Sequence, residues 1–160
     1  MNDKADPEVV RWACITLHPS LPSRFTQIAG ARAWGAHPDW REGADMSRVF
    51  IDDVSTTGRT TRWEGKLPMR DALIDALSGK PGPHNRVFFR SPLCIGFSDR
   101  QAAETMARIF SQGAMVYVQS EAGLYRDGDD LTEIMEAVRR DAKAAAQRRW
   151  RANKNEAGET

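Results

Sequence analysis

The chain has 160 residues, of which 41% are hydrophobic and 28% are charged, and its formal net charge at pH 7 is +1. This composition excludes wholesale disorder, and the sequence holds no apolar run of the roughly 18 residues needed to cross a membrane. The two cysteines and three scattered histidines fit neither a disulfide framework nor a metal-binding spacing, and the polar first residues do not resemble a signal peptide. We therefore expect one cytoplasmic domain with reduced thiols and without a metal, a cofactor or a membrane anchor.

The first third of the chain alternates between apolar strands and an amphipathic helix. Residues 1–8 should form a flexible N-terminus, and the β-branched run VVRWACITL at 9–17 predicts a buried strand. After two prolines, apolar residues at helical spacing predict a helix over 24–36. The apolar positions of this helix are Phe25, Ile28, Ala31 and Trp34. A short strand is expected at 48–54, where two carboxylates follow the apolar residues.

The alternation continues after a loop at 55–66 that is rich in Gly, Ser and Thr. A helix should follow, with Met69, Leu73 and Leu77 on its buried face. This helix is expected at 67–80, and further helices at 99–113 and 131–154. Strands are expected at 86–89 and 114–120, each followed by a loop, at 91–99 and 120–130. The sequence therefore predicts an α/β fold with a mainly parallel sheet of four to five strands, flanked by helices on both faces.

The expected organisation is an α/β domain at 9–128, a long basic C-terminal helix at 129–154 and a tail at 155–160. Functional sites of parallel sheets lie beyond the carboxyl ends of the strands. The segments to search are therefore the ones that follow the strands, at 16–20, 52–66, 91–98 and from 120 onward.

At these strand ends the sequence resembles the catalytic domain of serine recombinases, the resolvase/invertase class. The first strand of that family carries a Tyr-Ala-Arg-Val-Ser pattern, and residues 12–16 read Trp-Ala-Cys-Ile-Thr. A glutamine-containing helix follows, matched by Gln27, and the VFIDDVSTTG stretch at 49–58 matches a strand that ends in Asp before a mobile loop. Gly96 aligns PLCIGF at 92–97 with the family's Leu-Asp-Arg-Leu-Gly-Arg motif. The resemblance covers residues 9 to 152 and rests on element order and spacing more than on motif letters.

The resemblance implies a serine hydroxyl that attacks a DNA phosphodiester while several arginines bind the phosphate. Carried over position by position, Thr16 stands where the family has the serine, and Lys66 stands where it has the loop arginine. At the other motif positions the charged residues of the family are replaced by neutral ones, namely Cys14, Leu93, Cys94 and Phe97. Removing one preorganised charge donor typically costs on the order of 3 kcal/mol, or about 10²-fold in rate. We therefore expect a domain that has lost DNA strand cleavage and acts as a DNA- or protein-binding regulatory module.

Two enzymatic alternatives stay open. A small active recombinase could use Thr16 if arginines from elsewhere rebuild the phosphate site. The arginines in or near the strand-end loops are Arg59, Arg62, Arg70, Arg90 and Arg100, and Arg62 replaces Lys66 if the loop register shifts. The simpler interpretation is that these arginines are solvated surface charges. A distinct enzyme that reuses a crevice between Thr16, Lys66 and Cys94 is the other alternative. For the cysteines, a redox or metal pair competes with buried, inert thiols.

The last helix combines an apolar stripe with a strong positive charge. The stripe, at helical spacing, is formed by Leu131, Ile134, Met135, Val138, Ala142 and Ala145. The basic residues that we expect to contact nucleic acid are Arg139, Arg140, Lys143, Arg148, Arg149 and Arg151, with Lys154 beyond them. The resemblance implies a dimer built on this helix and DNA contact at its distal end, with a recombinase as a further partner. A solvated helix face is the simpler interpretation, and without the family's C-terminal helix-turn-helix any DNA binding should be weak and poorly specific.

Overall fold

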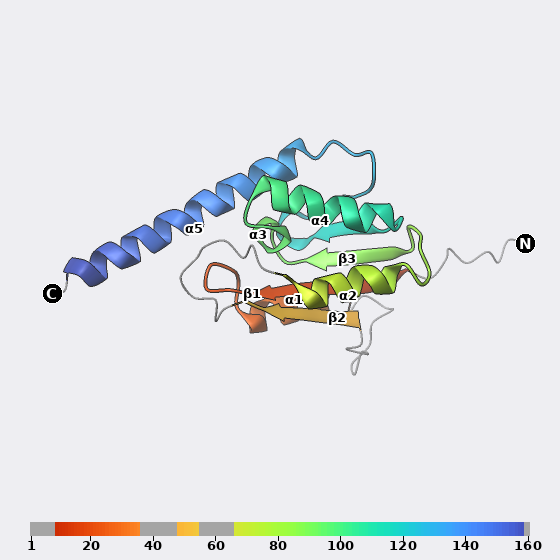
Figure 1. Ribbon diagram of the computed structural model, residues 1–160, viewed down its shortest axis with the longest axis horizontal. Helices are drawn as coiled ribbons and strands as arrows, with labels where there is room; N and C mark the ends of the chain where they lie inside the picture. The colour runs from red at the N-terminus through yellow and green to blue at the C-terminus, as the bar shows by residue number, and fades with distance from the viewer. Residues whose placement is uncertain (1–8, 36–47, 55–65, 159–160) are drawn as a thin grey trace, which may run out of the picture.

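The computed structural model describes residues 9–35, 48–54 and 66–158, and residues 1–8, Arg59 and Arg62 lie outside these ranges. Figure 1 shows an α/β body with a long helix that projects from it. The elements in chain order are β1 (Val10–Leu17), α1 (Arg24–Gly35), β2 (Val49–Asp53), α2 (Pro68–Leu77), β3 (Asn85–Phe89), α3 (Pro92–Ile95), α4 (Asp99–Ser111), β4 (Met115–Val118), a 3-10 turn (Gln119–Glu121), β5 (Gly123–Tyr125) and α5 (Thr132–Gly158). The predicted α/β class is confirmed.

The sheet has five strands in the order β2-β1-β3-β4-β5. β1 to β4 are parallel, and β5 pairs antiparallel with β4. The chain passes from β1 to one neighbour, β2, and then returns to the other side of β1 to form β3. The strand order therefore reverses between β1 and β3, where a crevice for ligands typically forms at the carboxyl edge of such a sheet.

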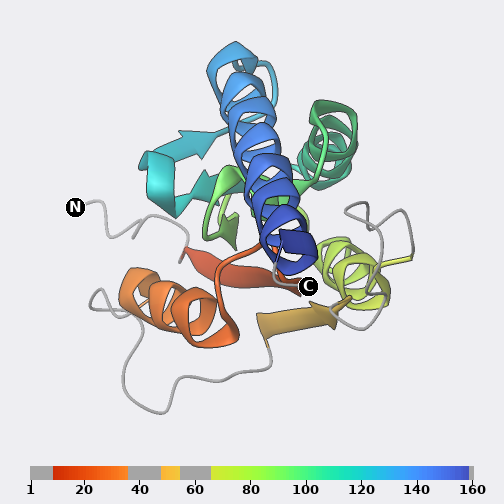
Figure 2. The same cartoon turned by 90° about the vertical axis from the view of Figure 1, so that its left-hand side faces the viewer.

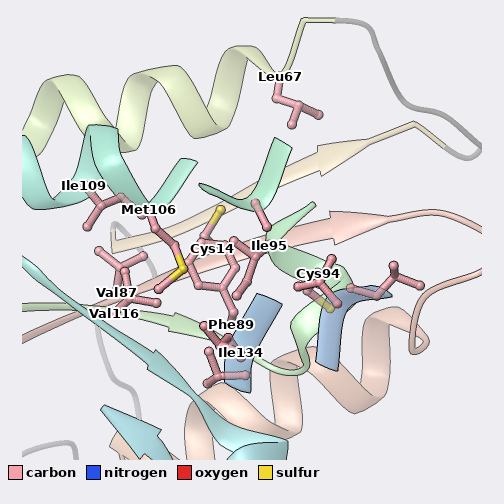
Figure 3. Close-up of a cluster of buried hydrophobic side chains, with 14 of the residues drawn as sticks. Cys14, Leu67, Val87, Phe89, Cys94, Ile95, Met106, Ile109, Val116 and Ile134 are labelled. Atoms are coloured by element: carbon pink, nitrogen blue, oxygen red, sulfur yellow. The ribbon is translucent and has the colours of Figure 1, made fainter. Parts of the chain in front are cut away.

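Helices cover the two faces of the sheet unequally. The larger core lies on the side of α2 to α5 and includes Leu73, Met106 and Ile134 beside strand residues such as Phe89. Figure 3 shows several of these side chains packed together. The smaller cluster lies under α1, where Ala31 packs with Phe88. Figure 2 shows α1 on the opposite side of the sheet from α2 and α4.

Four details differ from the sequence-based expectation. Phe25 is 81% exposed and Met69 is 40% exposed, although both had been placed on buried helix faces. The predicted loop at 91–99 contains the single helical turn α3, which begins with Pro92 at its first position, where the missing N–H costs nothing. The loop at 120–130 contains the three-residue edge strand β5, and α5 continues to Gly158 through part of the expected tail.

The apolar stripe of α5 is used within the chain. Ile134, Val138 and Ala145 are buried in the larger core, and Leu131, Met135 and Ala142 pack against it. α5 lies on α3 and α4, and its C-terminal part extends beyond the carboxyl edge of the sheet (Figure 1). The stripe that was expected to build a dimer is therefore covered by the protein's own core. Among the described helices none combines the length and the apolar character needed to span a membrane.

Candidate functional site

Thr16 stands near the carboxyl end of β1, beside Asp52 of β2 in the parallel register. The side chain of Thr16 is fully buried, with 0% exposure, and Asp52 is buried next to it. A buried polar side chain must find partners inside the protein, because leaving it without one costs about 1–3 kcal/mol. The partners of these two residues define the candidate site, which we call the Thr16 cluster: Thr16, Asp52, Arg70, Cys94 and Thr105.

Asp52 forms the N-terminal anchor of α2. Its Oδ1 accepts a hydrogen bond from Met69 N at 2.9 Å, and its Oδ2 accepts one from Arg70 N at 2.8 Å. Pro68 begins the helix at a position that needs no N–H. A carboxylate at a helix N-terminus is favoured both by these free N–H groups and by the helix dipole. Both oxygens of Asp52 are therefore engaged in holding α2 against the end of β2.

Arg70, in the first turn of α2, is the centre of the cluster and is only 2% exposed. Its Nη1 donates to Ile95 O at 2.6 Å and to Thr105 Oγ1 at 3.0 Å. Its Nη2 donates to Thr16 Oγ1 at 3.2 Å and to Cys94 O at 2.8 Å. Each terminal nitrogen of a guanidinium carries two N–H donors. All of the Nη donors are thus directed at groups of the protein itself, from β1, α3 and α4.

The glutamine of α1 closes the cluster from the other side of the sheet edge. Gln27 is fully buried, and its Nε2 donates to Thr16 O and Pro22 O, both at 2.8 Å. His18, two residues beyond Thr16, accepts a hydrogen bond from Ser20 N on its Nδ1 and meets the ring of Phe97 edge-on at 4.8 Å. The loop after β1 is therefore fastened at both ends.

Both cysteines are buried free thiols: Cys94 belongs to the cluster, and Cys14 lies beside it, close enough to Arg70 to feel its charge. Burial raises the pKa of the Cys14 thiol, and the nearby Arg70 guanidinium only partly opposes this effect. Burial also raises the pKa of Cys94, against a weaker opposing effect of the hydrogen bond from Ser91. A reactive thiol needs the opposite change, toward the thiolate. The geometry agrees with buried, unreactive thiols.

The predicted site residues fall into two groups. Thr16, Cys14, Leu93 and Cys94 come together at the carboxyl ends of β1 and β3, where they are buried. Lys66, in contrast, is exposed, and it is Arg70, one helical turn further along, that reaches Thr16. Phe97 is half-buried against the core.

Of the arginines considered as replacements for the lost phosphate ligands, Arg70 is the one in the described part of the chain that reaches Thr16. Arg100 is exposed and pairs with Glu104 at 3.2 Å. Arg90 lines a different crevice beside α1. The sequence pointed to Arg70 only as one of five arginines, because a charged residue within a helix is usually solvated. Asp52 had a stronger signal, since it stands near the carboxyl end of a predicted strand.

This arrangement is built to hold structure rather than to bind a phosphate. An incoming phosphate would have to displace Arg70 from carbonyl and hydroxyl acceptors that are themselves buried. Thr16 would also have to become accessible, which requires separation of α2, α3 and the end of β1. A crevice beyond the ends of β1 and β3 is lined by Ser20, Leu21, Ser91, Leu93 and three residues of α5, Asp141, Ala144 and Arg148, and not by Thr16.

The distal part of α5 is the second candidate element. Arg139 and Arg140, nearer its beginning, form ion pairs with Asp99 at 2.8 Å and with Glu121 at 3.0 Å. Arg149 faces the body, where its Nη2 donates to Ser20 Oγ at 2.8 Å. Lys143, Arg148 and Arg151 are exposed. The basic residues of this helix are therefore divided between internal ion pairs, an anchor to the loop after β1, and charges that face the solvent.

Comparison of the sequence with models of protein families and with curated proteins found no match.

Proposed function

We propose that this protein is a recombinase-like domain that has lost DNA strand cleavage and binds nucleic acid through the distal part of α5. The observation that carries the proposal is a row of solvent-facing cations on a helix that extends beyond the body (Figure 1). The row consists of Lys143, Arg151 and Lys154, and none of them has a carboxylate partner in the described part of the chain.

The three cations share one face of α5. Residues three, four, seven or eight positions apart lie on the same side of a helix, and Lys143, Arg151 and Lys154 follow this spacing. The residue half a turn away, Ala145, is buried against the body. The row therefore points away from the protein over about 16 Å of helix. A duplex of that length carries roughly ten phosphates, so the three cations can neutralise about a third of its charge.

The loss of cleavage is supported by the Thr16 cluster. A phosphoryl-transfer site needs fixed positive groups directed at the reacting oxygen atoms. Arg70 is the cation at Thr16, and its terminal donors are taken by protein acceptors. Lys66 is exposed to solvent. We therefore assign Thr16 and Arg70 to stability.

A salt titration tests nucleic-acid binding directly. Fluorescence anisotropy of a labelled duplex should show a dissociation constant that rises steeply with salt, because binding releases counterions. The double variant Lys143→Gln/Arg151→Gln should bind more weakly, with a log–log slope reduced by about 1.8 if each cation meets one phosphate. The matched control is Lys80→Gln/Arg126→Gln, which removes the same charge from exposed positions outside α5. Equal weakening by both double variants, or no binding at low salt, contradicts the proposal.

A second function, strand cleavage through Thr16, is favoured by one contact, the hydrogen bond from Arg70 to the Thr16 hydroxyl. Strand cleavage through Thr16 predicts that a covalent protein–DNA adduct forms with supercoiled DNA. The adduct should disappear in Thr16→Val and persist in the surface variant Arg100→Gln. We expect no adduct with the wild-type protein. An adduct that depends on Thr16 would establish the enzyme and overturn the loss of cleavage.

A homodimer and a recombinase partner stay predictions from the resemblance. The apolar stripe that was expected to form the dimer is covered by the core of the same chain. Any dimer must use another surface.

A further inference from the structure

Among the described residues, the two most exposed large apolar side chains are both aromatic. Phe25 is 81% exposed at the start of α1, and Trp150 is 63% exposed on the distal part of α5. A single exposed apolar residue is common on a protein surface, so the significance of each ring depends on the groups beside it. Arg24 precedes Phe25, and Arg149 and Arg151 flank Trp150. Both rings therefore stand among positive charges.

Both rings also lie toward the same end of the molecule. α1 begins after the loop that follows β1, and α5 passes this loop, where Arg149 donates to Ser20. The strands point toward this end, and the C-terminal part of α5 projects from it (Figure 1). A single extended ligand can approach both elements from this side.

Phe25 lines a crevice between α1 and the ends of β3 and β4. The crevice measures about 630 Å³ and is lined by Phe25, Ala29, Gly30, Arg90, Gln119 and Ser120, which we call the Phe25 crevice. This volume lies in the range of small-molecule sites. Its walls are cross-linked, because Ser120 N donates to Arg90 O at 3.0 Å and Gln119 Nε2 donates to Gly30 O at 2.9 Å.

Gly30 keeps the floor of this crevice close to α1. A Cβ atom at this position would collide with Gln119 Oε1 and would lie 3.0 Å from Arg90 Cδ. The glycine therefore allows the amide of Gln119 and the stem of Arg90 to cross the helix surface. An apolar ring, a guanidinium, an amide and a hydroxyl meet at one opening.

We propose that the Phe25 crevice binds an unpaired base of single-stranded DNA, so that the protein prefers a single strand to a duplex. The inference rests on the nucleic-acid binding proposed above and names its substrate class. A base stacks on the Phe25 ring, while the adjacent phosphate meets Arg90. Gln119 and Ser120 offer hydrogen bonds to the edge of the base. Such a combination of aromatic platforms and cations is how proteins bind single strands without strong sequence preference.

Trp150 supplies a second platform along the same strand. Lys154 Nζ lies 4.9 Å from the centre of the indole ring, a cation–π distance. The ring thus joins the basic row of α5. Within a duplex the base faces are stacked on each other and hidden, so neither Phe25 nor Trp150 could stack on them. The rings contribute only when the bases are unpaired.

The test compares a labelled 20-nucleotide oligo(dT) strand with a 20-base-pair duplex, using the full-length protein at fixed salt. Phe25→Leu, which keeps an apolar side chain and removes the ring, should weaken single-strand binding roughly 5- to 150-fold, the range for one stacked base. Duplex binding should stay unchanged. Phe25→Tyr should restore single-strand affinity, and Met69→Leu, at the exposed apolar position on α2, is the control.

Gly30→Ala narrows the crevice without touching the aromatic ring. It should also weaken single-strand binding selectively, and circular dichroism with thermal unfolding checks that the fold persists. If the α5 double variant weakens the binding of both strand and duplex while Phe25→Leu changes neither affinity, the proposed nucleic-acid binding stands. The Phe25 crevice is then not the site that binds the base. Equal affinity of the wild type for strand and duplex also overturns the inference. Loss of all binding in the wild type overturns the proposed function itself.

Discussion

Arg70 and Thr16 lie 54 positions apart in the sequence, yet Nη2 of Arg70 donates to Oγ1 of Thr16 at 3.2 Å. The same guanidinium donates to the main chain of α3 and to Thr105 of α4. One side chain therefore joins β1, α2, α3 and α4. The backbone N–H of Arg70 also donates to Oδ2 of the buried Asp52 at 2.8 Å, so the residue is held through its main chain as well.

Substitution of Arg70 should destabilise the protein severely. Arg70→Met leaves four buried acceptors without their donor, and each buried polar group left without a partner typically costs about 1–3 kcal/mol. Arg70→Lys should recover little, because an ammonium cannot reproduce the planar fork. Urea unfolding followed by circular dichroism measures the change, with the exposed Arg100→Met as the control. A loss below about 1 kcal/mol would show that the cluster does not hold the fold together.

Thr16→Val should have a modest effect on stability and none on nucleic-acid binding. Valine keeps the β-branched shape in a strand but removes the acceptor for Arg70 Nη2. Leaving that buried donor without a partner costs about 1–3 kcal/mol. The free energy of unfolding and the anisotropy titration measure the two effects separately. A variant of unchanged stability with weakened DNA binding would instead place Thr16 at the ligand.

The two buried thiols should be protected from thiol reagents in the folded protein. They should also lower the free energy of unfolding as the pH becomes alkaline. Burial raises the pKa of both Cys14 and Cys94 above the ordinary thiol value. Above roughly pH 8.5 an unfolded chain loses these protons while the folded chain keeps them, so the free energy of unfolding falls as the pH rises toward the raised pKa values. Below about pH 8.5 both thiols keep their protons in either state, and their contribution to the free energy of unfolding is fully present.

A thiol-reactive disulfide reagent at pH 8 checks this protection. The native protein should react only at its rate of opening, and both thiols should react quickly in denaturant. The double variant Cys14→Ala/Cys94→Ala should show a weaker decrease of stability between pH 8 and pH 10. Rapid labelling of the native protein would mean that the cluster opens readily.

Ile134→Ala tests whether the apolar stripe of α5 serves the core of the chain or a dimer. Ile134 is buried at 1% exposure, and truncating such a residue costs about 2–5 kcal/mol. Because its neighbours belong to the same chain, the loss and the melting temperature should not depend on protein concentration. Thermal unfolding over an approximately 100-fold range of concentration measures this. A melting temperature that rises with concentration would indicate that a second copy contributes to stability.

The sequence predicted the elements whose periodicity extends over several turns or pleats. β1, α1, α2, α4 and α5 are long enough for apolar residues to recur, and all five were expected near their observed positions. α3 and β5 have only four and three residues, which is too short to show a period. The position of α3 depends on contacts with α5, which is distant in the sequence, and that of β5 on its pairing with β4.

The buried polar cluster was predictable only in part. Thr16 and the neutral positions Cys14, Leu93 and Cys94 could be located because they lie at or just beyond the carboxyl ends of predicted strands. The role of Arg70 depends on acceptors in α3 and α4, and helical spacing contains no information about them. Phe25 shows the opposite limit, since its apolar spacing predicted burial while the described structure leaves the ring in solvent.

The two halves of α5 differ in what surrounds them, although the helix is continuous over 27 residues. Its length is about 40 Å, and its first half cannot move without disturbing the core. The outer half is therefore held at a fixed angle to the sheet, because Ile134 and Val138 anchor the first half in the core. If the outer half binds a strand as proposed, the strand takes the same fixed angle.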